Sequence, residues 1–284
     1  MTDATLPPTR EGWVTGGESP ESQRLASRRE LAGQAAIEYA DATAEEILTW
    51  ARRTFGTHRV AVASSMADTA LPHLVAAHLP GIDVLFLDTG YHFPETLRTR
   101  DELSRRVDVR IRSLRPALSV AEQDQRYGAG LFGRDPSRCC AMRKVEPLSR
   151  TLGGYDAWIT GVRRVEGPTR ARTPIVEWDA TFGLVKINPL IAWSDADVET
   201  YLREHDVPVH PLLSQGYPSI GCAPCTRRVA AGEDPRSGRW SGFEKTECGL
   251  HPAPLTGALP SPATPTPGKR HTTVHLHGSV TEEI

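Results

Sequence analysis

Short apolar runs alternate with amphipathic stretches along most of the chain. The apolar runs have the length and β-branched content of strands: RVAVASS, VLFLDT, VDVRIRSL, AWITGVRR and VKINPLI. Between them, apolar residues recur at helical spacing in segments 67–79, 117–126, 141–152 and 194–205, and again after Pro94. Strands alternating with helices predict an α/β fold, with a mostly parallel sheet and helices on both faces. Ligands of such sheets usually bind at the carboxyl ends of the strands.

The pattern also predicts where the folded part begins and ends. A helix is expected over 44–55, because Thr43 and Glu46 have capping-box spacing and Gly56 follows the last apolar position. Residues 1–29 are polar and rich in Pro and Gly, and they predict a flexible leader. Residues 252–284 are Pro-rich at first and predict a disordered tail. Residues 30–251 are therefore the expected domain.

Composition narrows the function classes. The chain has 33 Lys plus Arg against 35 Asp plus Glu, which gives no global signature of nucleic-acid binding. No uncharged apolar run approaches the length that crosses a bilayer, and the first residues lack the basic and apolar regions of a secretory signal. We therefore expect a cytoplasmic protein, whose five cysteines are ligands or nucleophiles rather than disulfides.

Four of the cysteines form two pairs, Cys139-Cys140 and Cys222-Ala-Pro-Cys225. Adjacent Cα atoms are about 3.8 Å apart, which is shorter than a disulfide normally allows. A single zinc ion draws its sulfurs close together, whereas neighbouring side chains on a helix diverge by about 100°. A [4Fe–4S] cluster spreads its ligands over four corners, so geometry favours the cluster over zinc. Incidental buried thiols are the remaining alternative.

The fifth cysteine, Cys248, lies in FEKTECGLH, and Arg236, Arg239 and Lys245 precede it. Nearby cations favour the thiolate, which is the nucleophilic form of cysteine. The flexible Gly249 would let the residue reach into a site and be reached by a partner. An inert surface thiol would give the same pattern.

Two stretches indicate an anion site. Ser64, Ser65 and Asp68 lie where the first predicted strand meets a helix, a junction that can bind phosphate through backbone N–H groups. The stretch 138–172 contains eight Arg or Lys residues against three acidic ones. Arginine offers paired donors to phosphate or sulfate oxygens. An ordinary turn and a solvated basic face are the alternatives.

Taken together, the motifs resemble the family of assimilatory adenylyl-sulfate and phosphoadenylyl-sulfate reductases. The matching stretches run in family order over about residues 40–251: SSMADTALPHL, LDTGYHFPET, CCAMRKVEPL, WITGVRRVEGPTRA, IGCAPCT and GRWSGFEKTECGLH. The resemblance implies an adenine-nucleotide α-hydrolase-like fold of the pyrophosphatase-loop type. It makes 30–251 a reductase domain whose C-terminal catalytic segment is 236–251. The glycine-rich SGGxDS loop of ATP-using relatives is absent at Ser64 to Asp68, which argues against ATP hydrolysis.

The resemblance also implies an activity, thioredoxin-dependent reduction of adenosine 5′-phosphosulfate to sulfite and AMP in sulfate assimilation and cysteine biosynthesis. Cys248 is the implied nucleophile and forms an S-sulfocysteine that thioredoxin then attacks. Cys139, Cys140, Cys222 and Cys225 are the implied ligands of a [4Fe–4S] cluster. The implied substrate contacts are Ser64, Ser65, Asp68, Lys144, Arg163, Arg164, Arg236, Arg239 and His251. Family members differ in oligomeric state, so a homo-oligomer is compatible with the resemblance.

Three other functions are weighed against this one. The first is reduction of 3′-phosphoadenylyl sulfate, although family members with both cysteine pairs mostly use the unphosphorylated nucleotide. The second is an ATP-using enzyme that thiolates tRNA. The third is an iron–sulfur regulator that binds nucleic acid through its Arg-rich stretch, although no helix-turn-helix or zinc-finger pattern is present.

Overall fold

A six-stranded sheet forms the centre of the protein in our computed structural model, which describes residues 19–67, 69–245 and 247–250. The strand order is β3-β2-β1-β4-β6-β5. The strands are β1 (Val60–Ala63), β2 (Ile82–Leu87), β3 (Val109–Leu114), β4 (Ala157–Ile159), β5 (Val176–Asp179) and β6 (Leu184–Ile187). All neighbouring pairs are parallel except β5 and β6. The expected mostly parallel sheet is therefore confirmed.

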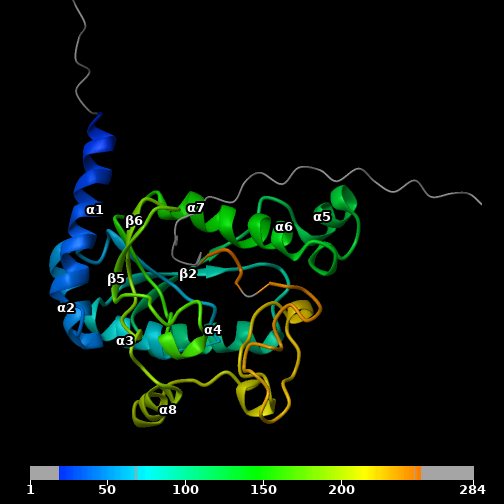
Figure 1. The fold of residues 1–284 in the computed structure, drawn as a ribbon. Coiled ribbons are helices and arrows are strands. Elements are labelled where there is room, and N and C mark those ends of the chain that lie inside the picture. The colour runs from blue at the N-terminus through cyan, green and yellow to red at the C-terminus, as the bar shows by residue number, and fades with distance from the viewer. Residues whose placement is uncertain (1–18, 68, 246, 251–284) are drawn as a thin grey trace, which may run out of the picture. The chain divides into compact units, whose positions relative to one another are not determined.

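Both faces of the sheet are covered, as the near-continuous apolar runs require. In β2, Val84 and Phe86 point into one hydrophobic cluster while Leu85 points into the other, so the pleat divides the strand between two cores. Figure 1 shows α3 and α4 on one side of β2 and α7 on the other. Helices on both faces are confirmed.

Most of the helices follow the predicted segments, although no segment was predicted for α1 or α6. Their bounds are α1 (Pro20–Glu38), α2 (Ala44–Phe55), α3 (Ala70–His78), α4 (Pro94–Arg106), α5 (Val120–Tyr127), α6 (Pro136–Cys140), α7 (Glu146–Leu152) and α8 (Asp195–Glu204). Short turns of helix are η1 (Leu131–Gly133), η3 (Arg164–Glu166), η4 (Leu213–Gln215) and η5 (Ala223–Cys225). A π-helical turn, η2 (Ala141–Val145), joins α6 to α7. No helix in the described ranges has the length and apolarity needed to cross a membrane.

Helix α2 begins where the sequence predicts. The Thr43 side chain accepts a hydrogen bond from the Glu46 N–H at 3.2 Å, and the Glu46 carboxylate accepts one from the Thr43 N–H at 2.8 Å. These bonds satisfy donors that the first helical turn leaves open. Gly56 ends the helix with φ +64°, a conformation that glycine adopts without strain.

The chain adds strands first on one side of β1 and then on the other. β2 and β3 lie on one side of β1, while β4, β6 and β5 lie on the other. The connections from the carboxyl ends of β1 and β4 therefore run to opposite sides, and open α/β sheets usually bind ligands at such a point. Ser64 follows β1 and Thr160 follows β4 at this edge.

Two other features differ from the prediction. β5 pairs antiparallel at the edge of the sheet, and its sequence, VEWD, alternates apolar and polar residues over only four positions, which is too short to indicate a strand. The leader expected over 1–29 is wrong from residue 20 onward, because α1 begins at Pro20 after the N-cap Ser19. Its buried Ala32 and Ala35 pack in the main hydrophobic core. The described residues belong to one compact unit, and the tail expected over 252–284 lies outside them.

Candidate active site

The four paired cysteines line one pocket. Cys139 and Cys140 are consecutive residues of α6. Cys222 caps the turn η5 and Cys225 is its last residue, more than 80 residues later in the chain. Arg143, Lys144, Tyr91, Phe132, Pro136 and Trp240 complete the lining. Cys139, Cys140 and Cys222 are buried, Cys225 is half-buried, and all are free thiols. The structure thus brings together two motifs that the sequence could only list separately.

The loop after β2 joins the two cysteine pairs. The Ala223 N–H donates to the Tyr91 carbonyl at 2.7 Å, and the Thr89 hydroxyl lies 3.3 Å from Cys222 Sγ. From the α6 side, Arg143 Nε donates to the Thr89 carbonyl at 2.6 Å. Gly90 has φ +74° between them, and a Cβ there would lie 3.0 Å from Val120 Cγ2. This close approach explains the glycine of LDTGYHF.

The thiols influence one another electrostatically. Burial raises the pKa of Cys139 to about 12, and the charges of Cys140, Cys222 and Cys225 add to the effect. Burial, followed by the charges of Cys222 and Cys140, raises the pKa of Cys225 to about 11. Four thiolates cannot share this pocket without a compensating positive charge.

The donor set is compatible with an iron–sulfur cluster. Within the described residues, no group of three or more His, Cys, Asp or Glu side chains is arranged to hold one metal ion. All four cysteines nevertheless face one pocket, as a cluster that spreads its ligands over several irons requires. Cys139 and Cys140 are adjacent on a helix, so their side chains diverge as expected.

Cys248 lies beside this pocket. After burial and Lys144, the charge of Cys248 is the next influence on the pKa of Cys140, and it raises that pKa. Cys248 packs against the smaller hydrophobic cluster, which contains Leu148, Trp158 and the buried Leu250. Lys245 Nζ also donates to Ser137 Oγ at 3.2 Å, which ties the segment before Cys248 to α6.

Two cations face Cys248. Burial opposes the charge of Lys144, but the thiolates of Cys222, Cys248 and Cys140 outweigh it and raise the pKa of Lys144. Arg239 donates to the Ser219 hydroxyl and to the Ile220 carbonyl, each at 3.3 Å, while its Nε is buried without a hydrogen-bond partner in the described structure. Lys144 and Arg239 thus bring positive charge near Cys248.

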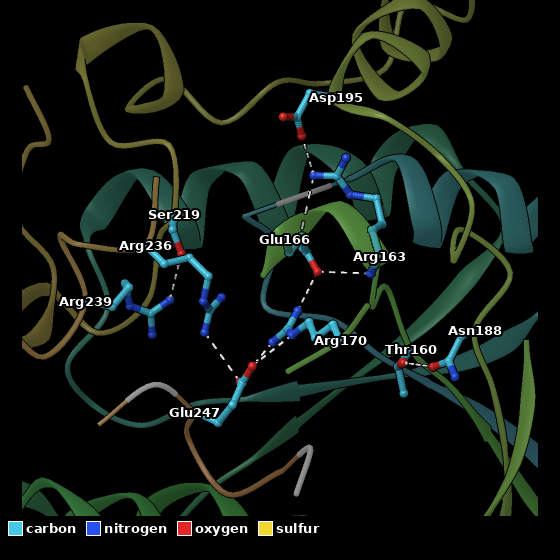
Figure 2. Close-up of polar contacts among 10 residues, drawn as sticks. All are labelled: Thr160, Arg163, Glu166, Arg170, Asn188, Asp195, Ser219, Arg236, Arg239 and Glu247. Carbon is cyan, nitrogen blue, oxygen red and sulfur yellow. Dashed lines mark hydrogen bonds and ion pairs between the residues drawn. The ribbon is translucent and has the colours of Figure 1, made fainter. Parts of the chain in front are cut away.

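A chain of ion pairs runs along the other side of the site (Figure 2). Arg163 Nη2 lies 2.8 Å from Asp195 and 3.9 Å from Glu166. Glu166 pairs with Arg170, which makes a bidentate pair with Glu247 at 2.8 and 2.9 Å. Arg236 Nη2 lies 3.4 Å from the same Glu247 carboxylate. Acidic side chains thus organise the arginines that the sequence predicts as anion contacts.

The arginines of stretch 138–172 do not form one basic face. Arg143 is buried and holds the Thr89 carbonyl, whereas Arg138 lies over the Tyr127 ring. Arg164 Nε donates to the Thr173 carbonyl at 3.1 Å. Arg163 keeps its Nε and Nη1 atoms buried and without a hydrogen-bond partner in the described residues, so it is the member of the stretch best prepared for an anion.

Two side-chain-to-backbone hydrogen bonds shape the loop after β1. The Ser64 hydroxyl accepts a hydrogen bond from the Met66 N–H at 3.2 Å, and the Ser65 hydroxyl accepts one from the Ala67 N–H at 3.4 Å. Met66 has φ +60° and is fully buried. Asp68 and His251, the other two predicted contacts, lie outside the described residues.

Comparison with known proteins agrees with this arrangement. Residues 57–228, more than half of the chain, match the family described as Phosphoadenosine phosphosulfate reductase domain. The chain belongs to this family. The curated relatives of this reductase-family protein include several named adenosine 5′-phosphosulfate reductase, two of them from Streptomyces coelicolor and Mycobacterium tuberculosis. The protein from Streptomyces coelicolor is 56% identical over 231 residues, with 81% of this chain and 98% of the relative covered. The protein from Mycobacterium tuberculosis is 52% identical over 251 residues, with 82% and 99% covered.

A solved structure supports the fold. Phosphoadenylyl-sulfate reductase from Candida auris, in a phosphate complex, aligns with TM-score 0.59 and 26% identity, covering 71% of this chain and 97% of that one. The adenine-nucleotide α-hydrolase-like sheet implied by the resemblance is therefore confirmed for this reductase-family chain. Sequence reasoning missed the acidic residues Glu166, Asp195 and Glu247 as parts of the site. Of the three, only Glu166 could have been found from the sequence, because it lies four residues before Arg170, a spacing that favours an ion pair.

Proposed function

We propose that the protein reduces adenosine 5′-phosphosulfate to sulfite and AMP, with thioredoxin as reductant, in the cytoplasmic assimilation of sulfate for cysteine biosynthesis. The observation that carries the proposal is that Cys248 packs against the hydrophobic cluster of α7, where its charge acts on Cys140 of the four-cysteine pocket and on Lys144 and Arg239. The names of the curated relatives support the same substrate. They favour this activity over tRNA thiolation and over a nucleic-acid-binding regulator.

The reaction consists of two thiol displacements. The Cys248 thiolate attacks the sulfur of the phosphosulfate, the bond from that sulfur to the bridging oxygen breaks, and AMP leaves. A thioredoxin thiolate then attacks Cys248 Sγ, and sulfite departs with the electron pair. The second thioredoxin thiol closes the disulfide of thioredoxin and releases the Cys248 thiolate, so the two electrons come from thioredoxin.

The residues divide into three groups by role. Lys144, Arg163, Arg164, Arg236 and Arg239 would bind phosphate and sulfate oxygens, where preorganised donors stabilise the developing charge. Ser64, Ser65, Asp68 and His251 would complete the nucleotide site. Cys139, Cys140, Cys222 and Cys225 would hold a [4Fe–4S] cluster, which would position and polarise the substrate rather than transfer electrons.

Mass spectrometry of the intact protein tests the nucleophile. After mixing with adenosine 5′-phosphosulfate and no thioredoxin, we expect one sulfonate adduct, located on Cys248. Cys248→Ser should abolish the adduct and sulfite release but keep the absorption near ~400 nm that a Cys-ligated cluster gives. Cys139→Ser should lose that absorption. An active Cys248→Ser variant would disprove the assignment.

The 3′-phosphorylated nucleotide is the competing substrate, and the Candida auris neighbour is named for it. Identity of 52–56% to adenosine 5′-phosphosulfate reductases, against 26% to that neighbour, favours the unphosphorylated form. Comparison of kcat/KM for the two nucleotides decides between them. A higher value for the 3′-phosphorylated substrate would overturn our choice.

A further inference from the structure

Glu247 immediately precedes the nucleophile and is held by arginines from elsewhere in the fold. Its Oε1 and Oε2 accept hydrogen bonds from Arg170 Nε and Nη2 at 2.8 and 2.9 Å, and Arg236 Nη2 approaches Oε2 at 3.4 Å (Figure 2). The Glu247 side chain is 15% exposed and that of Arg170 is 11% exposed. Bidentate, charge-assisted bonds with so little solvent contact are among the strongest and most directional that side chains form.

Arg170, which holds Glu247, is itself held by a second carboxylate. Arg170 pairs with Glu166, whose carboxylate also accepts a hydrogen bond from the Arg163 N–H at 3.0 Å. Burial lowers the pKa of Arg170, but the carboxylates of Glu247 and Glu166 outweigh burial and raise it. Glu247 is therefore bound to the loop between β4 and β5, through Arg170, which is 77 positions earlier in the sequence.

Cys248 is fixed on its other side as well. Leu250 is 9% exposed and belongs to the hydrophobic cluster beneath α7, with Leu148, Leu152 and Trp158. Between the two anchors Gly249 has φ +85°, and a Cβ at this position would meet Val145 Cγ2 at 3.5 Å. An ionic anchor on one side and an apolar anchor on the other leave the Cys248 thiol little freedom.

We propose that Glu247 is the positioning residue of Cys248, and that its ion pair with Arg170 latches the nucleophile in the docked position needed for attack. The inference rests on the proposed function, because it assigns the latch to the first displacement. A hydrogen-bonded ion pair suits this role, since the second displacement requires thioredoxin to reach Cys248 Sγ and the segment must be able to leave. Positioning of a reacting group within about 1 Å strongly affects rate.

The test compares Glu247→Gln with Glu244→Gln, a matched control because Glu244 is exposed and lies three residues earlier. Without substrate, the rate of iodoacetamide alkylation of Cys248, followed peptide by peptide, should rise about tenfold in Glu247→Gln. The single-turnover rate of Cys248 sulfonation should fall about tenfold. The affinity for AMP, measured by calorimetry, should not fall, because a negative charge has been removed from the arginines. Glu244→Gln should match the wild type in all three.

Two further variants keep the test valid if Glu247→Gln folds poorly. Glu247→Asp retains the carboxylate and should recover part of the sulfonation rate. Arg170→Lys keeps the charge but loses the paired donors, so it should reproduce the Glu247→Gln effects. The double variant Glu247→Gln/Arg170→Lys should sulfonate Cys248 no more slowly than the slower of the two single variants, because both changes break the same ion pair.

Two results would overturn the latch. One is a Glu247→Gln variant with wild-type alkylation and sulfonation rates. The other is a loss of AMP affinity as large as the loss of rate, which would mean that Glu247 supports the whole pocket rather than Cys248. If the wild type itself forms no sulfonate adduct, the proposed function fails, while the alkylation rates still decide whether the ion pair holds the segment.

Discussion

At the residue scale, glycines decide how closely the cysteine loops approach charged side chains. Gly221 precedes Cys222, and a Cβ built on it would lie 2.6 Å from Arg239 Cζ. Arg239 also lies over the Trp240 ring, with Cζ 4.6 Å from the ring centroid. The Arg239 guanidinium, to which we assign substrate binding, thus occupies the space that a side chain at position 221 would fill.

Gly221→Ala should therefore impair function more than stability. The colliding atoms are at the end of a flexible side chain, so Arg239 would turn away while the backbone remains. We expect kcat/KM for adenosine 5′-phosphosulfate to fall about tenfold or more, the effect of losing a charged hydrogen bond. Gly153→Ala is the control, since φ at Gly153 is −56° and the nearest contact of its Cβ would be 3.9 Å away. Equal kcat/KM in both variants would contradict the prediction.

At the element scale, local signals explain most helix starts. Capping boxes begin α2, α5 and α8, where the side chains of Thr43, Ser119 and Ser194 each accept a hydrogen bond from the N–H three residues later. Helix α6, which carries Cys139 and Cys140, has no capping box. The Asp135 side chain caps its start, and the π-helical turn η2 joins its end to α7. Such wide turns often occur at functional sites.

Thr43→Ala should lower the free energy of unfolding by about 1 kcal/mol, because it leaves helix donors without a partner. Chemical denaturation monitored by circular dichroism measures the change. Ser149→Ala, at an exposed position of α7, should change the free energy by less than about 0.5 kcal/mol. A loss at Thr43 no larger than that at Ser149 would show that the cap contributes nothing.

At the scale of the whole molecule, buried histidines link stability to pH. His210 is 1% exposed, its Nδ1 accepts from the Leu212 N–H at 3.2 Å, and its Nε2 lies 2.9 Å from the Thr96 hydroxyl. Burial lowers the pKa of His210, and burial followed by the charge of His205 lowers that of His73. Both groups therefore favour the neutral form in the folded state.

The sign of the pH dependence follows from these shifts. As pH falls below the unfolded value near ~6.5, the unfolded chain binds protons that the folded protein does not, so stability decreases with acidification. We expect the free energy of unfolding to be lower at about pH 5 than at about pH 7.5. His210→Gln should flatten this dependence, whereas His58→Gln, at an exposed turn, should leave it unchanged. A variant at 210 with the full wild-type slope would exclude His210 as a contributor.

The sequence by itself determined what depends on local pattern. Apolar runs located five of the six strands, a capping box located α2 at its true first residue, and the two cysteine motifs with ECGLH identified the family before any contact was known. β5 and the whole of α1 escaped prediction, because an edge strand and a helix that packs on β5 and β6 depend on partners distant in sequence.

Only the tertiary structure decided how the site is assembled. The pairing of Arg170 with Glu247 spans 77 residues, and no periodicity in the sequence records it. The structure also separated Arg143, which holds the Thr89 carbonyl, from Arg163, whose buried Nε and Nη1 have no hydrogen-bond partner among the described residues, although both belong to the same basic stretch. The physical reason is that charge and residue type are local properties, whereas burial and hydrogen-bond partners exist only once distant segments meet at the edge of the sheet.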